Sequence, residues 1–142
     1  MSDPLYAKDL LRLAANATGA GRLLPNSAEG HAHNPTCGDR ISVTLRLDDA
    51  GRIAAMAHET QACVLAQASA SILGSHLAGA DASAVRTLRA QVTAMLREGA
   101  VPPIPFADYS TLTGAARFRN RHSCVLLPID AVLDALSKAD AS

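Results

Sequence analysis

The sequence predicts an α+β domain in which a small antiparallel sheet of about three strands packs against several helices. Two observations indicate this class. Apolar residues recur at a period of two between residues 41 and 58, as in half-buried strands, and at helical spacing in the flanking segments. The chain has 142 residues, of which 49% are apolar. This length suits one hydrophobic core, so residues 1–142 are expected to form a single domain.

An N-terminal helix is expected over residues 1–19. Asp3 can cap it, Pro4 takes the first helical position, and Gly19 follows its end. Residues 19–35 are rich in Gly, Asn, Ser and His, which is typical of a loop. A short strand is expected in this loop at residues 31–33.

A β-hairpin follows the loop. Its first strand alternates apolar and polar side chains from Ile41 to Leu47, and its second carries Ile53, Ala55 and Ala57 on one face. Residues 48–51 (DDAG) between them have turn composition.

Two helices are expected after the hairpin. Thr60 is the expected cap of the first, over residues 61–77, and Asp81 is the cap of the second, which ends at Gly99. The apolar stripe of each helix indicates core packing rather than a cofactor site. In the second helix the stripe is Val85, Leu88, Val92, Met95 and Leu96.

The last helix is expected to open at Cys124. Ser123 is its possible cap, and Pro128 must lie in its first turns. Residues 100–120, with three prolines near their start, are expected to connect it to the preceding helix.

Charge and hydropathy exclude several functional classes. The 13 Lys and Arg residues balance the 13 Asp and Glu residues, with no basic run to neutralise phosphates, which argues against a nucleic-acid partner. No apolar segment is long enough for a membrane span. The N-terminus has no signal-peptide pattern, so a cytoplasmic location is expected.

The three cysteines lie at junctions between loops and regular elements. Cys37 and Asp39 flank Gly38 and can face one ion, while Cys63 and Cys124 stand at helix starts, where the macrodipole favours a thiolate. One cysteine alone is more often a buried spacer. Three thiols with one carboxylate match tetrahedral Zn²⁺, and thiolates also suit iron–sulfur chemistry.

Such a zinc site has a formal charge of −2 and favours neighbouring cations. Arg40 adjoins the first cysteine motif, and Arg121 is the best placed of three arginines before Cys124, the others being Arg117 and Arg119. No metal role is expected for the loop histidines His31, His33 and His122.

Three segments resemble the cysteine motifs of the U-type iron–sulfur cluster assembly proteins, the IscU, SufU and NifU N-terminal family. They are residues 34–41 (NPTCGDRI), residues 62–71 (ACVLAQASAS) and the Arg-x-x-Cys of residues 121–124. The match extends over residues 34–136. The long interval before the last motif, with Leu112, Gly114 and Phe118, resembles the SufU branch, so residues 100–120 correspond to an insertion that the IscU branch lacks.

The resemblance implies a SufU/IscU-like fold and a role in iron–sulfur cluster assembly. It implies that Cys37, Asp39, Cys63 and Cys124 bind zinc or a transient [2Fe-2S] or [4Fe-4S] cluster. The implied partners are a cysteine desulfurase of the SufS or IscS type and downstream cluster carriers or acceptors. The implied activity is that of a scaffold or of a zinc-dependent sulfurtransferase that takes persulfide sulfur.

Within this interpretation, Cys37 is expected to accept sulfur first, because its Gly38-flanked loop is the most mobile junction; Cys124 is the second candidate. Three features depart from the family pattern. The first helix lacks the usual His-Tyr and Pro-x-Asn, Ala62 replaces a common glycine, and Ser123 replaces a histidine or lysine beside Cys124.

Two other functional classes remain open from the residues alone. One is a non-catalytic binding module whose fold is stabilised by a bound metal. The other is a cysteine hydrolase using Cys37 with His31 or His33 as base, although no orienting partner or oxyanion motif is identifiable.

Overall fold

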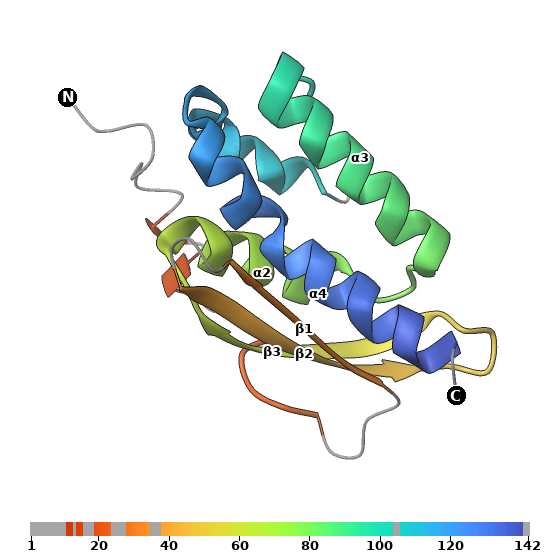
Figure 1. Ribbon diagram of the computed structural model, residues 1–142. Helices are drawn as coiled ribbons and strands as arrows, with labels where there is room; N and C mark the ends of the chain where they lie inside the picture. The colour runs from red at the N-terminus through yellow and green to blue at the C-terminus, as the bar shows by residue number, and fades with distance from the viewer. Residues whose placement is uncertain are drawn as a thin grey trace.

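The structure is a computed structural model that describes residues 11–12, 14–15, 19–23, 28–34, 38–103 and 106–140. Its elements run in the order β1 (Ala28–Asn34), β2 (Asp39–Leu47), β3 (Ile53–Gln61), α2 (Val64–His76), α3 (Ala82–Glu98), η2 (Ala107–Arg117), η3 (Arg119–Arg121) and α4 (His122–Asp140). The sheet has the strand order β1-β2-β3, and α4 and α2 pack on it while α3 packs against α4 (Figure 1). The α+β class with a three-stranded sheet is confirmed.

Both strand pairs are antiparallel. β1 and β2 pair from Ala28↔Leu45 to Asn34↔Asp39, and β2 and β3 pair from Arg40↔Gln61 to Leu47↔Ile53. The predicted hairpin is confirmed, and its turn is closed by the Asp48 carboxylate, which accepts hydrogen bonds from the backbone N–H of Ala50 and Arg52, both at 2.9 Å.

β1 is longer than expected, because the strand spans Ala28–Asn34 rather than residues 31–33. Its glycine and histidines hide the strand pattern in the sequence. The predicted N-terminal helix lies largely outside the described residues, although residues 11–12 and 14–15 are helical.

The predicted starts of two helices are wrong. Thr60 does not cap α2; it belongs to β3, and its hydroxyl bonds His58 Nδ1 at 2.9 Å. The N-cap of α2 is Cys63. α4 begins at His122, so Ser123 lies inside its first turn and is not a cap.

The limits of α3 are as predicted. Asp81 accepts a hydrogen bond from the Ala84 N–H at 2.9 Å, and Gly99 ends the helix in the left-handed conformation, with φ of 81°. All five residues of its predicted stripe are buried, namely Val85, Leu88, Val92, Met95 and Leu96.

The segment before α4 is folded rather than a plain connector. Its 3₁₀ helix η2 carries Tyr109, which is completely buried. Ser69 of α2 donates to the Val125 carbonyl of α4 at 2.8 Å, so the Tyr109 hydroxyl, 2.7 Å away, must donate to Ser69 Oγ. Burial raises the pKa of Tyr109. This network ties η2, α2 and α4 together.

α4 lies unusually close to β1. A Cβ on Gly30 would collide with the carbonyl oxygen of Ala131 and the backbone nitrogen of Ala135, so only glycine allows this approach. The same helix accepts a hydrogen bond from the edge strand, since the His31 N–H donates to Asp134 Oδ2 at 2.9 Å. α4 therefore both packs on β1 and satisfies a polar group of an edge strand.

None of the helices described is long and apolar enough to cross a membrane.

Gly30→Ala is expected to destabilise the fold by about 1–3 kcal/mol, because the added methyl group meets backbone atoms that cannot rotate away. Urea unfolding measures this change. Ala54→Val, on an exposed position of β3, is the control and should change stability by less than about 0.5 kcal/mol. A Gly30→Ala variant as stable as the control would contradict the close approach.

Asp134 should stabilise the folded protein by an amount that decreases as the pH becomes acidic. The hydrogen bond from the His31 N–H is the main cause that lowers the pKa of Asp134 below its ordinary value, and the hydrogen bond from Lys138 is the second. A lowered folded-state pKa adds stability above the unfolded-state pKa of about 3.9, and this stability is lost as the pH falls through the folded-state value. The gain is less than about 1 kcal/mol, because the side chain is 37% exposed and water screens it.

The test compares the unfolding free energies of the wild type and Asp134→Ala as the pH is lowered from about 5 toward 2. The difference between them should shrink over this range. Asp49→Ala, in the exposed β2–β3 turn, should change little at any pH. A constant difference for Asp134→Ala would mean that its carboxylate charge plays no part.

Candidate metal centre

Asp39, Cys63 and Cys124 come together at one point of the fold. One carboxylate oxygen and the two Sγ atoms all lie within 4.8 Å of one another. They come from three elements, since Asp39 begins β2, Cys63 caps α2 and Cys124 lies in the first turn of α4. Residues widely separated in sequence thus form a compact set of possible ligands.

Asp39 is positioned by the turn between β1 and β2. Gly38 has a φ of 76°, which favours glycine, and its N–H donates to the Asn34 carbonyl at 2.8 Å. Asn34 is also the strand partner of Asp39. The turn therefore directs the Asp39 carboxylate into the protein, where the residue is only 7% exposed.

Cys63 is positioned by the start of α2. Its backbone is extended, and its carbonyl accepts the Gln67 N–H at 3.0 Å, while Gln67 Nε2 donates to the Ala62 carbonyl at 2.8 Å. The first turn of α2 contains no acidic residue, so the positive end of its dipole favours an anionic ligand at this point.

Cys124 is buried, at 1% exposure, and its helix is tied to the first cysteine motif. Asn34 Nδ2 donates to Ser123 Oγ at 2.9 Å. The residue next to Cys124 is therefore bonded to the strand that precedes the Gly38 turn. No sequence signal indicates this bond, because serine and asparagine are common in loops and caps.

The donors fit a thiophilic metal ion. Asp39 Oδ2 is buried and has no hydrogen-bond partner in the part of the chain that the structure describes. Such a carboxylate oxygen is costly unless a cation neutralises it. Ligands at ~2.3 Å from a tetrahedral Zn²⁺ lie ~3.7 Å apart, so the three side chains need to move by only about 1 Å. Thiolates and a carboxylate suit zinc, and thiolates suit iron–sulfur clusters.

The remaining predicted site residues are not part of this ligand set or are not described. Cys37 is outside the described residues. Arg40 is exposed, and strand alternation turns its side chain away from the face of Asp39. Arg121 is half-buried in η3. The roles of Arg40 and Arg121 beside the metal stay predictions.

The histidines take no part in the ligand set within the described residues. His31 is exposed, and its Nδ1 bonds Ser42 Oγ at 2.9 Å. His33 is exposed as well, and His122 is half-buried beside Arg119 in a separate cleft.

Comparison with known proteins identifies the family. Residues 5–124 match the model of the NifU-like N-terminal domain. The chain belongs to this family. The resemblance of the three cysteine motifs is thereby confirmed.

Individual relatives cover nearly the whole chain. It is 29% identical over 140 residues to the zinc-dependent sulfurtransferase SufU of Bacillus subtilis (strain 168), covering 97% of this chain and 93% of that protein. The crystal structure of a nitrogen-fixing NifU-like protein (N-terminal) from Brucella abortus superposes with a TM-score of 0.89 at 33% identity, covering 99% of this chain and 97% of its own. A putative iron–sulfur cluster assembly scaffold for the SUF system from Fervidobacterium islandicum AW-1 shares the fold, with a TM-score of 0.82 at 17% identity, covering 96% of this chain and 99% of its own.

Asp39→Ala is expected to change thermal stability differently with and without bound zinc. In the zinc-loaded protein it removes a ligand and lowers the melting temperature. In the zinc-free protein it removes a buried carboxylate oxygen without a described partner, so stability should be unchanged or higher by up to about 2 kcal/mol. Thermal unfolding with added zinc and with a chelator measures both effects.

Glu98→Ala, at the exposed end of α3, is the control and should keep the full stabilisation by zinc. If Asp39→Ala is stabilised by zinc as strongly as the wild type, Asp39 is not a ligand.

Proposed function

We propose that this protein is an iron–sulfur cluster assembly protein that accepts persulfide sulfur in a zinc-dependent manner. The observation that carries the proposal is the convergence of Asp39, Cys63 and Cys124 around an Asp39 oxygen that has no partner among the described residues. Membership of the NifU-like family and similarity to a protein named a zinc-dependent sulfurtransferase support it.

Cys37 completes the proposed site as the fourth ligand. It stands two residues before Asp39 and next to Gly38, where an added Cβ would meet no atom within 4 Å. Zinc, when bound, supplies positive charge that keeps the ligating thiols deprotonated at neutral pH. Asp39, Cys63 and Cys124 would then hold the ion while the Cys37 sulfur reacts.

The proposed reaction is a thiol exchange. The Cys37 thiolate attacks the outer sulfur of a cysteine persulfide on the donor, a cysteine desulfurase of the SufS or IscS type. A bond forms between Cys37 Sγ and the outer sulfur, and the sulfur–sulfur bond of the donor breaks. The donor cysteine leaves as a thiolate, so no external oxidant or reductant is needed. The proton on the outer sulfur stays with it.

A scaffold that assembles a [2Fe-2S] or [4Fe-4S] cluster on the same residues is the second candidate. The two described cysteines are soft donors, which suit an iron–sulfur cluster as well as a zinc ion. Anaerobic reconstitution with iron, cysteine and a desulfurase separates the two. A stable visible-absorbing cluster indicates a scaffold that hands clusters to downstream carriers, whereas tightly held zinc and a faster desulfurase indicate a sulfur acceptor.

The two classes left open by the residues are weaker. A cysteine hydrolase would need a histidine base, but His31 is engaged with Ser42 and belongs to no ligand group within the described residues. A binding module stapled by metal would lose only stability when its accessible thiols are alkylated. The proposed function instead requires loss of sulfur acceptance.

Cys37→Ser should abolish persulfide acceptance and leave the fold largely intact, because Asp39, Cys63 and Cys124 remain to hold the metal. Mass spectrometry after incubation with a desulfurase and cysteine detects the mass of the added sulfur atom, and circular dichroism reports the fold. Cys124→Ser is the matched comparison. Wild-type sulfur loading of Cys37→Ser would refute the role of Cys37, and loss confined to Cys124→Ser would give that role to Cys124.

A further inference from the structure

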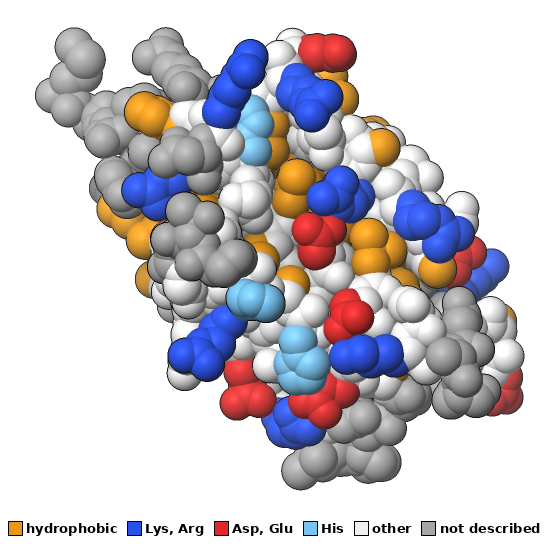
Figure 2. All heavy atoms as spheres, in the orientation of Figure 1, with side chains coloured by type: hydrophobic (Ala, Val, Ile, Leu, Met, Phe, Trp, Pro, Cys, Tyr) orange, Lys and Arg blue, Asp and Glu red, His pale blue; other side chains and the backbone are white. Residues whose placement is uncertain are grey.

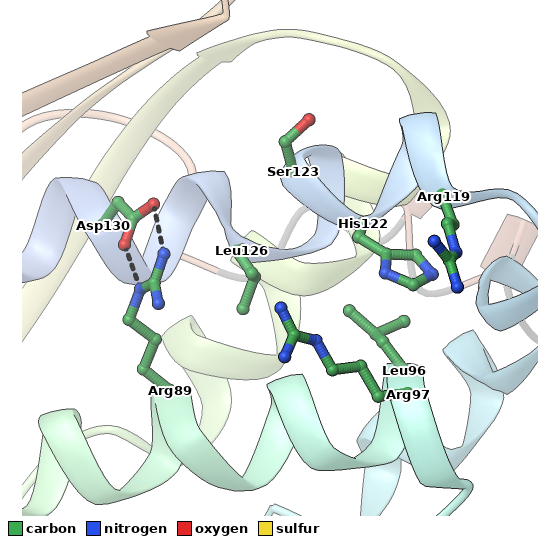
Figure 3. A pocket seen from close by; sticks show the side chains of 8 residues that line it. All are labelled: Arg89, Leu96, Arg97, Arg119, His122, Ser123, Leu126 and Asp130. Atoms are coloured by element: carbon green, nitrogen blue, oxygen red, sulfur yellow. Dashed lines mark hydrogen bonds and ion pairs between the residues drawn. The ribbon is translucent and has the colours of Figure 1, made fainter.

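A wide cleft lies between α3 and α4, beside the candidate metal centre but not part of it. Its volume is about 790 Å³, and its polar lining residues are Arg89, Arg97, Arg119, His122, Ser123 and Asp130. Figure 3 shows the Arg97 side chain reaching from α3 into the cleft, with His122 and Arg119 on one side and the Arg89–Asp130 pair on the other.

The cleft carries uncompensated positive charge. Arg89 is neutralised, because its Nε lies 2.6 Å and its Nη2 3.4 Å from the Asp130 carboxylate. The side chains of Arg97 and Arg119 form no hydrogen bond or ion pair with any described residue, and both residues are exposed. Arg97 is stabilised by the last turn of α3, where the helix dipole favours a cation, and its guanidinium remains available.

Exposed apolar side chains stand close to these two arginines in the chain. Val101, four residues after Arg97, is 49% exposed, and Phe118, adjacent to Arg119, is 38% exposed. Only one other large apolar side chain, Leu11, is exposed among the described residues. Figure 2 shows several basic side chains over the upper ends of α3 and α4, with hydrophobic side chains and one acidic side chain among them.

Arginines without a described partner, with exposed apolar residues near them in the chain, favour a protein partner over a small anion. A phosphate or nucleotide would use the arginines but would not need apolar side chains beyond the cleft. A protein segment with acidic and apolar residues would cover both, and the apolar contacts would supply affinity while the charges guide encounter.

The cleft is linked to the site of chemistry through α4. Ser123 lines the cleft, precedes Cys124 in the chain and accepts the hydrogen bond from Asn34 of the first cysteine motif. A protein seated in the cleft is therefore one residue away from a candidate metal ligand.

We infer that the α3–α4 cleft is the docking groove for an acidic segment, with apolar residues, of the protein that donates sulfur. The inference rests on the proposed function, which supplies a cysteine desulfurase as that partner. The Arg97 and Arg119 guanidiniums bind carboxylates of the segment, and Val101 and Phe118 pack against its apolar side chains.

The test measures the affinity of the zinc-loaded protein for the cysteine desulfurase of the same organism by calorimetry at two salt concentrations. The Arg97→Glu/Arg119→Glu variant should weaken binding at least tenfold, mainly at low salt, and Val101→Ser/Phe118→Ser should weaken it at both salt concentrations. The control Arg52→Glu/Arg86→Glu makes the same change in net charge at exposed positions outside the cleft and should change the affinity less than twofold. Zinc content and melting temperature verify that each variant is folded.

Three results would overturn the inference. The first is unchanged affinity of Arg97→Glu/Arg119→Glu, and the second is an equal loss in the control variant. The third is stabilisation of the wild type by pyrophosphate that Arg97→Glu/Arg119→Glu abolishes without weakening desulfurase binding, which would make the cleft a small-anion site. If the wild type neither binds the desulfurase nor gains sulfur, the proposed function itself is wrong. If the wild type does both and the cleft variant binds as tightly, only the docking groove is wrong.

Discussion

The position of the candidate metal centre depends on the packing of α4 against β1 at Gly30. Because this residue has no Cβ, the backbone of α4 at Ala131 and Ala135 can lie directly on the strand. The bond from the His31 N–H to Asp134 fixes the helix along the same edge. β1 leads into the turn before Asp39, and α4 begins with the turn that holds Cys124. Strand and helix must therefore lie this close for the carboxylate and the thiol to meet.

A buried hydrogen-bonded network also positions the residues of the candidate centre. Ser69 joins Tyr109 to the Val125 carbonyl, one residue after Cys124, and so connects the helix capped by Cys63 to the helix that carries Cys124. A hydrogen-bonded network in the interior has few alternative arrangements, because each unsatisfied member would cost about 1–3 kcal/mol. It therefore fixes the register of α2 against α4 more strictly than the small alanine side chains around it could.

The elements that could be predicted are those whose patterns are local. The hairpin follows from alternation and a turn, and α3 follows from Asp81, its stripe and Gly99. The start of α2 could not be found in this way, because pairing with β2 extends β3 through Gln61 and takes Thr60 from the helix. In the same way, the ligand types indicated a metal centre, but the bond from Asn34 to Ser123 depends on tertiary contact. No local pattern indicates the burial of Tyr109, because residues distant in the sequence, such as Ser69, surround it.

The formal net charge of zero conceals an uneven distribution of charge around α4. One face of its first turns presents Cys124 to a centre that would carry a formal charge of −2 with zinc and four anionic ligands. The adjacent face, with His122, Leu126 and Asp130 at helical spacing, lines a cleft in which Arg97 and Arg119 have no described counter-ion. Arg97 reaches this cleft from α3 and Arg119 from η3, so positive charge from two other elements lies along the same helix that presents Cys124. Both arginines are exposed to solvent, so their charge is available to the partner proposed for the cleft, while the other face of α4 serves the candidate centre.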